Sequence, residues 1–129
     1  MGEICHNYGI LGSECDGGFA EYTKVAAKHA YAVNSSMSDV ELASFPCSYS
    51  TAENMLARSN VTEGVRVLIY GASGGVGSAA IQLAKACGAH VIAITSQSKN
   101  QQLLELGADE VVTRVMIWSK PWVKAPLTL

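Results

Sequence analysis

A run of apolar residues that leads directly into closely spaced glycines is the feature that most constrains the fold of this chain. Residues 65–77 read VRVLIYGASGGVG. The apolar run at 67–70 has the composition of a strand in a parallel sheet covered on both faces. After the glycines, small and apolar residues recur at helical spacing and form one stripe. This order predicts a strand, a tight turn and a helix.

The glycine turn has the chemistry of an anion site. Gly71, Gly74, Gly75 and Gly77 carry no Cβ that would keep a phosphate away from the backbone. The turn also opens a helix, and the first amide groups of a helix have no partner within it. The segment is therefore expected to hold a pyrophosphate without a basic side chain.

Length and charge limit the classes of function that fit the chain. Its 129 residues, 49% of them hydrophobic, suffice for one globular core, and a net charge of -2 provides no field for a polyanion such as nucleic acid. No apolar run approaches the roughly 20 residues that cross a bilayer. The first residues, MGEICHNYG, lack the basic and apolar regions of a signal peptide. We expect a cytoplasmic protein that binds neither nucleic acid nor a membrane.

The cysteines do not have the spacing of a disulfide framework. They lie at Cys5, Cys15, Cys47 and Cys87. Cys87 falls on the apolar stripe that follows the glycine turn, where a free thiol packs as a small core residue. The cysteines are therefore interpreted either as reduced thiols or as metal ligands.

A capping box predicts a helix before the glycine turn. Ser38 is followed three residues later by Glu41, and the helix is expected to begin near Asp39. Pro46 then lies where a proline restarts a helix, so residues 49–58 are expected to form a second helical stretch.

Two further strands and a helix are predicted after the glycine turn. Residues 90–95 form a buried strand, and Ser98 with Gln101 forms a second capping box that opens a helix. Gly107 lies where a left-handed C-terminal cap is wanted, and residues 110–113 are a third strand candidate. The order strand, helix, strand, helix, strand predicts an α/β fold, half of a doubly wound parallel sheet.

Four stretches of the sequence, taken together in this order, resemble the medium-chain dehydrogenase/reductase superfamily, specifically its zinc-dependent alcohol dehydrogenase branch. They read CHNYGILGSECDGGFAEY, ELASFPCSYSTAENML, VLIYGASGGVGSAAIQLAKACGAHVIAIT and LLELGADEVV. The resemblance covers residues 1 to about 113, and four ordered segments are more specific than one glycine motif. The fingerprint has the form Ala72-x-Gly74-x-x-Gly77, as in quinone-reductase-like members.

The resemblance implies a division of the chain. Residues 1–36 would be a C-terminal β/α remnant of the catalytic, GroES-like domain, with strand candidates at 18–25 and 30–33. Residues 37–60 would be connecting helices, and 61–113 the first half, three strands with helices, of an NAD(P)-binding Rossmann-type domain. Residues 114–129 form an atypical tail, either an end without a function of its own or an apolar arm.

The resemblance also assigns roles to single residues. Cys47 matches one ligand of the catalytic zinc, and Thr51 matches a threonine that packs beside the nicotinamide. Cys5 matches the last of four cysteines that bind a structural zinc. A catalytic zinc needs three protein ligands, and no other Cys or His here matches the family's motifs; His6, His29 and His90 are interpreted as surface histidines.

The cofactor implied is a nicotinamide dinucleotide, whose pyrophosphate the turn Gly71, Ala72, Gly74, Gly75, Val76 and Gly77 would hold. NAD-specific sites carry an acidic residue about 20 positions after the glycines, and the second strand here ends without one. Ser96, Ser98 and Lys99 could instead hold a 2′-phosphate, which favours NADP while leaving NAD open. The alternative is that Ser98 caps a helix and Lys99 is a solvated residue of its first turn.

Three functions remain open from the sequence. The first is a zinc-type oxidoreductase that transfers hydride between an alcohol, aldehyde or ketone and NAD(P), represented by a catalytically incompetent fragment. The second is an NADP(H)-binding module without catalysis, and the third is a structural or interaction remnant. Because the strand at 65–70 would lack its neighbour on one side, self-association through that open edge is also expected.

Overall fold

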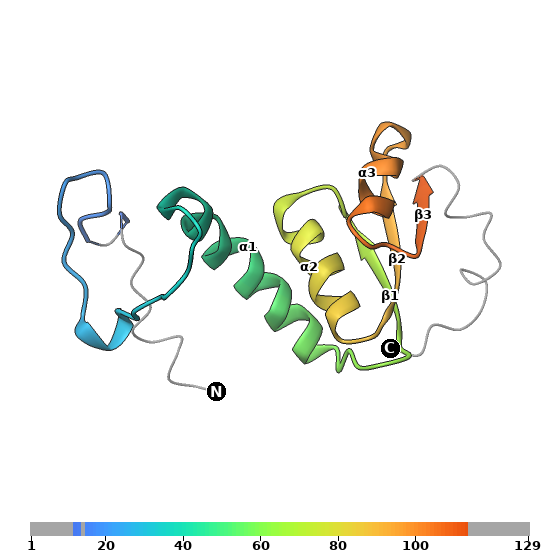
Figure 1. Ribbon diagram of the computed structural model, residues 1–129, viewed down its shortest axis with the longest axis horizontal. Coiled ribbons are helices and arrows are strands. Elements are labelled where there is room, and N and C mark those ends of the chain that lie inside the picture. Colours follow the sequence, from blue (N-terminus) through green and yellow to red (C-terminus); the bar gives the residue numbers. More distant parts are fainter. Residues whose placement is uncertain (1–11, 14, 114–129) are drawn as a thin grey trace. The chain divides into compact units, whose positions relative to one another are not determined.

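The computed structural model of the chain describes residues 12, 13 and 15–113 (Figure 1). The chain divides into two compact units, Met1–Ser36 and Met37–Leu129. Across the described part of the chain, no helix combines the length and the apolar character that spanning a membrane requires.

The described residues of the first unit contain little regular structure. Its described residues form one short 3-10 helix, η1 (Ala27–His29), and the strands expected at 18–25 and 30–33 are not formed. The side chains of Phe19 and Tyr22 are exposed, at 111% and 89%. Strands are stabilised by a pairing neighbour and a buried face, and the described residues of this unit provide neither, so the prediction of strands here was wrong.

The second unit begins with α1 (Asp39–Arg58), and the capping box that predicted its start is confirmed. The Ser38 backbone amide donates to Glu41 Oε2 at 2.8 Å, and the Glu41 amide donates to Ser38 Oγ at 3.4 Å. The hydroxyl and the amide of Ser38, which both donate to the Glu41 carboxylate, hold the pKa of Glu41 below its ordinary value. The cap fixes where the chain leaves the first unit and becomes helical.

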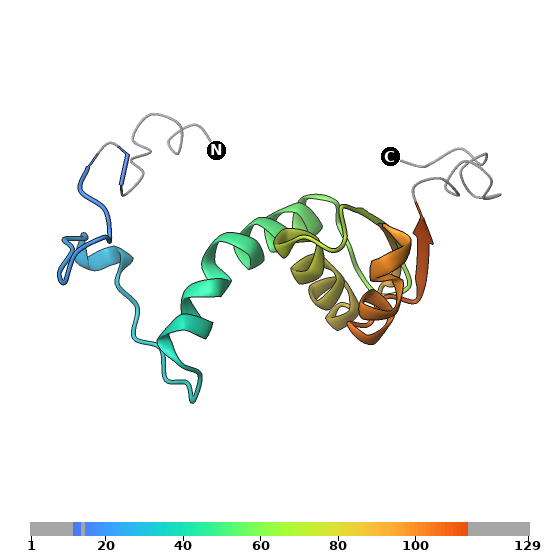
Figure 2. The same ribbon diagram turned by 90° about the horizontal axis from the view of Figure 1, so that it is seen from above.

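Pro46 does not divide this segment into two helices. The structure shows one continuous helix of 20 residues with Pro46 inside it, as the single long coil of α1 in Figures 1 and 2 shows. A proline removes one backbone donor from a helix. The helix nevertheless continues through Pro46, and its part after the proline is anchored to the core by Ala52 and Leu56.

The sheet has three parallel strands in the order β1-β2-β3, as predicted. They are β1 (Arg66–Tyr70), β2 (His90–Thr95) and β3 (Glu110–Thr113). The crossovers are α2 (Gly75–Ala86) and, after the 3-10 turn η2 (Gln97–Lys99), α3 (Asn100–Glu105). This is the first half of a doubly wound Rossmann-type sheet, and β1 pairs on one side only among the described strands.

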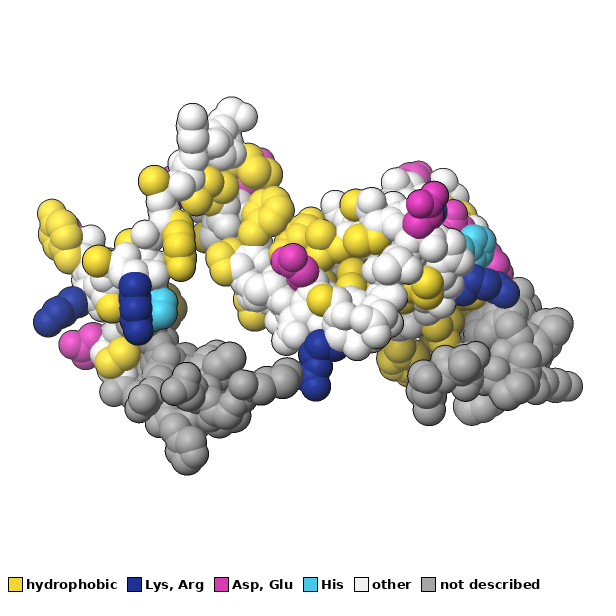
Figure 3. Space-filling model, turned by 90° about the horizontal axis from the view of Figure 1, so that it is seen from below, with side chains coloured by type: hydrophobic (Ala, Val, Ile, Leu, Met, Phe, Trp, Pro, Cys, Tyr) yellow, Lys and Arg dark blue, Asp and Glu magenta, His cyan; other side chains and the backbone are white. Residues whose placement is uncertain are grey.

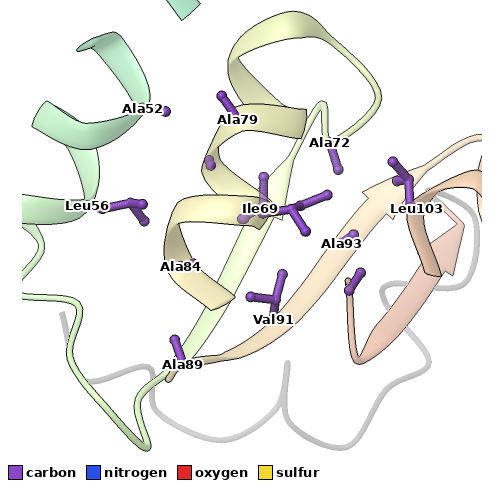
Figure 4. Packing of buried hydrophobic residues seen from close by; sticks show 13 residues of the cluster. Ala52, Leu56, Ile69, Ala72, Ala79, Ala84, Ala89, Val91, Ala93 and Leu103 are labelled. Carbon is purple, nitrogen blue, oxygen red and sulfur yellow. The ribbon is translucent and has the colours of Figure 1, made fainter. Parts of the chain in front are cut away.

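The core lies between the helices and one face of the sheet (Figure 4). Ile81 of α2, Val91 of β2 and Leu103 of α3 are almost completely buried. Most other members of the cluster are alanines, among them Ala52 of α1 and Ala79 of α2, whose short side chains allow the elements to approach closely. The close approach of α1 and α2 to each other and to the sheet also brings them near the glycine turn that follows β1.

Of the two capping predictions made for the segment after the glycine turn, one was wrong and one was right. Ser98 does not cap a helix with Gln101: α3 begins two residues later, at Asn100, after η2, and its cap has no side-chain hydrogen bond. The side-chain Nε2 of Gln101 donates instead to Glu105 Oε1 at 3.0 Å, one turn ahead on α3. The left-handed cap is confirmed, since Gly107 has φ 115° and donates to Leu104 O at 3.0 Å.

Charged side chains gather where the strands begin. Lys85 Nζ lies 2.8 Å from Asp109 Oδ1, and the amide of Val91 donates to Asp109 Oδ2 at 2.7 Å. The ring of His90 meets Glu110 Oε1 at 2.9 Å. Figure 3 shows histidine, acidic and basic side chains side by side on this part of the surface. These contacts join α2, β2 and β3 at the end of the sheet opposite the glycine turn.

Candidate dinucleotide-binding site

The glycine turn leaves β1 with a left-handed residue and is then fixed by two backbone hydrogen bonds. Gly71 has φ 66°, a conformation that side chains with a Cβ rarely adopt. Gly74 N donates to Gly71 O at 3.0 Å, which closes the turn. Ala72 N donates to Ile94 O at 3.2 Å, which joins the turn to the end of β2. The turn is therefore held by the sheet and needs no ligand to define it.

The glycines of the turn are required for different reasons. A Cβ built on Gly77 would lie 2.7 Å from Ala72 Cα and 3.0 Å from Ala72 C, so no side chain fits between α2 and the turn. A Cβ on Gly74 would meet only Gly71 O, at an ordinary 3.4 Å. Gly77 thus allows α2 to pack against the turn, and Gly71 allows the backbone to adopt its left-handed conformation. The packing of the described residues leaves open space at the Cβ position of Gly71 and no close contact at that of Gly74, so this side of the turn has room for a ligand.

The start of α2 presents amide groups without partners among the described residues. Gly74 is the N-cap and provides no side-chain hydrogen bond, and the first helical bond runs from Ser78 N to Gly74 O at 2.8 Å. The amides of Gly75 and Val76 have no acceptor in the described part of the chain. The partial positive charge of a helix N-terminus favours an anion at this point.

A groove of about 560 Å³ opens beside this helix start. It is lined by residues 67–70 of β1, the glycine turn, the first residues of α2, Met55 and Leu56 of α1, and Ser59 just after α1. The volume lies within the range of about 300–1,000 Å³ that is typical of small-molecule sites. An apolar groove with amide donors at one end has the form expected for a dinucleotide site.

The residues expected to select the nucleotide lie in one turn after β2. Ser96 is the N-cap of η2, its Oγ lies 3.2 Å from Ser98 Oγ, and Lys99 is the last residue of η2. Because β1 and β2 are parallel and in register, this turn lies at the same end of the sheet as the glycine turn. No carboxylate occurs between the end of β2 and Glu105.

Thr95, the last residue of β2, was not singled out in the sequence. Its side chain is only 4% exposed, and its Oγ1 has no hydrogen-bond partner in the described part of the chain. A buried hydroxyl without a partner is uncommon in proteins. The sequence shows that a polar residue ends the second strand. Its burial, which marks it as a candidate site residue, is known only from the structure.

Cys47, matched to a zinc ligand, and Thr51, matched to a residue beside the nicotinamide, lie one turn apart on α1, as their spacing predicted. The thiol of Cys47 is free and exposed, and Thr51 Oγ1 donates to Cys47 O at 2.7 Å. Neither residue lines the groove. Among the described residues no group of three His, Cys, Asp or Glu side chains could hold a metal ion, so these residues do not by themselves fit a zinc centre. Cys5 lies outside the described residues.

The family model that matches this chain and two of its curated relatives are all described as dehydrogenases or reductases. The family described as zinc-binding dehydrogenase matches residues 75–125. The chain is 37% identical over 108 residues to an acryloyl-coenzyme A reductase of Metallosphaera sedula, covering 84% of this chain and 32% of that protein. It is 34% identical over 122 residues to an alcohol dehydrogenase of Geobacillus stearothermophilus, covering 94% of this chain and 36% of that protein. The chain therefore spans about a third of the length of these curated relatives.

Solved structures agree with the sequences. The quinone oxidoreductase of Thermus thermophilus, whose complex with NADPH is also known, superimposes with a TM-score of 0.64 at 36% identity, covering 70% of this chain and 32% of that one. The same strand-turn-helix unit, the same parallel sheet and the matching segments lead to one conclusion: the chain belongs to the zinc-binding dehydrogenases of the medium-chain dehydrogenase/reductase superfamily.

Proposed function

We propose that this chain provides the pyrophosphate-binding half of an NADP(H)-dependent zinc-type dehydrogenase or reductase. The observation that carries the proposal is the start of α2, where the free amides of Gly75 and Val76 open onto the groove beside β1. The names of the relatives, an alcohol dehydrogenase and an acryloyl-coenzyme A reductase, support alcohols or carbonyl compounds as the substrate class.

Each part of the chain has a defined task in this proposal. The bound dinucleotide supplies the hydride chemistry at its nicotinamide ring. The glycine turn holds the pyrophosphate through backbone amides, and Ser96 with Lys99 holds the 2′-phosphate by hydrogen bonding and charge. Thr51 is proposed to pack beside the nicotinamide.

Cys47 is proposed as one zinc ligand of the whole protein, and Cys5 as a ligand of a structural zinc. The described residues alone do not fit a zinc centre. The 129-residue chain is accordingly proposed to bind the dinucleotide without turning over an alcohol. The free thiols of Cys47 and Cys87 support a reducing, cytoplasmic location.

Titration of the purified chain with NADPH and NADH, followed by the change in nicotinamide fluorescence, tests the central claim. Saturable binding with a preference for NADPH is the expected result. Alcohol-dependent reduction of NADP and the zinc content of the same sample are measured in parallel. Binding with turnover and bound zinc would show a competent enzyme, and binding alone would show a module. Failure to bind either dinucleotide would refute the proposal.

A further inference from the structure

The serine and threonine hydroxyl groups of α1 follow a pattern with one exception. Ser44 Oγ donates to Glu41 O at 2.6 Å, Thr51 Oγ1 donates to Cys47 O at 2.7 Å, and Ser50 Oγ donates to Pro46 O. This return to the backbone one turn earlier is common for hydroxyls inside helices. Ser48 lies among these residues, and its hydroxyl makes no hydrogen bond within the described part of the chain.

The hydroxyl of Ser48 instead lies against the first residue of α2. A Cβ built on Gly75 would be 2.9 Å from Ser48 Oγ and 3.8 Å from Ser48 Cβ. The side chain of Ser48 is half-buried. Its helix, α1, lies alongside α2 (Figure 1). Ser48 Oγ therefore lies next to the backbone of Gly75, whose amide is one of the unpaired donors of the turn.

We infer that Ser48 is a further dinucleotide-binding residue, whose hydroxyl donates a hydrogen bond to the pyrophosphate held at the start of α2. The inference rests on the proposed function and adds a side-chain donor from a different helix. The site otherwise consists of neutral backbone donors, and a hydroxyl with a free proton is the matching donor for a phosphate oxygen. A side chain at position 75 would displace the Ser48 hydroxyl from this place.

The binding role is tested with the full 129-residue chain, NADPH and NADH as the two probes, and the variant Ser48→Ala. A hydrogen bond to a charged group contributes enough that its loss raises Kd about tenfold. Because the pyrophosphate is common to both nucleotides, Kd should rise by the same factor for each. The matched control is Ser50→Ala, whose hydroxyl is committed to Pro46 O and which should leave both values unchanged. Thermal unfolding midpoints show whether each variant is folded.

The placement of the hydroxyl is tested separately and without a nucleotide. Gly75→Ala alone should lower the midpoint of urea unfolding, and it should be better tolerated when Ser48 is also replaced by Ala, since the 2.9 Å contact is then absent. Equal effects of Gly75→Ala in both backgrounds would overturn the inference.

Two outcomes of the titrations distinguish the inference from the proposed function. If the wild-type chain binds both dinucleotides and Ser48→Ala leaves Kd unchanged, or raises it for NADPH alone, only the role of Ser48 is overturned. If the wild-type chain binds neither dinucleotide, the proposed function fails and the inferred ligand fails with it.

Discussion

Gly77 lies so close to Ala72 that a Cβ on Gly77 would be 2.7 Å from Ala72 Cα. Ala72 is itself completely buried and is tied through its amide to Ile94 O at the end of β2. Neither backbone can retreat without opening the sheet or the helix. The contact therefore fixes the position of the α2 N-terminus relative to the strands, and with it the direction of the free amides.

Gly77→Ala is expected to destabilise the chain. The added methyl group overlaps buried backbone, and overpacking of this kind costs about 1–3 kcal/mol. Urea unfolding followed by circular dichroism measures the loss. Gly74→Ala is the matched control, because its Cβ would meet only Gly71 O at 3.4 Å, and it should cost less than Gly77→Ala. Equal losses for the two variants would contradict the packing role of Gly77.

Asp109 is expected to make stability depend on pH. The hydrogen bond from Lys85 and the backbone hydrogen bond from Val91 hold the pKa of the Asp109 carboxyl below its ordinary value of 3.8. A carboxyl with a lowered folded-state pKa contributes stability that is fully present above its unfolded-state pKa. That contribution is lost as the pH falls from 3.8 through the folded-state pKa.

The variant Asp109→Asn tests this linkage. It should unfold at a lower urea concentration than wild type at neutral pH, and the difference should narrow as the pH falls below 3.8. Glu53→Gln removes an exposed carboxylate of α1 that makes no ion pair among the described residues, so it serves as the control for charge alone. A difference between Asp109→Asn and wild type that stays constant down to strongly acidic pH would argue against the Lys85 contact as its source.

Lys99→Ala is expected to lower the affinity for NADPH and to leave the affinity for NADH unchanged. The lysine ends η2, in the turn that contains the Ser96 and Ser98 hydroxyls, and only NADPH carries the 2′-phosphate that its charge would contact. Fluorescence titration of both nucleotides measures the two dissociation constants, with Lys28→Ala of η1 as the control. Equal wild-type affinity for both nucleotides, unaffected by the substitution, would refute the phosphate role.

The free edge and exposed face of β1 are expected to promote self-association of the chain. Among the described strands β1 pairs only with β2, and its Leu68 and Tyr70 are 42% and 65% exposed. Leu68→Lys should shift the chain toward monomer in sedimentation velocity, since a charged edge discourages pairing. Leu104→Lys, at a leucine of α3 that is 44% exposed, is the matched control and should not do so. A wild-type chain that stays monomeric at micromolar concentration would contradict this expectation.

The parts of the fold that could be predicted are those governed by residues close in sequence. The Ser38–Glu41 box set the start of α1, and Gly107 ended α3, because each acts through hydrogen bonds within one turn. The Ser98–Gln101 pattern failed since the chain first makes the 3-10 turn η2. The strands expected at 18–25 and 30–33 failed because a strand depends on a partner that local sequence does not specify.

The sequence by itself determined the strand-turn-helix unit, the parallel order of the three strands and the family, since glycine spacing and hydrophobic period are local properties. Only the tertiary structure decided what each glycine is for. Gly77 is required by Ala72 in the folded turn, and Gly75 contacts Ser48 of α1, a segment that the sequence does not show to be its neighbour. Close packing of α1 against α2 creates the second contact, and packing depends on the whole core.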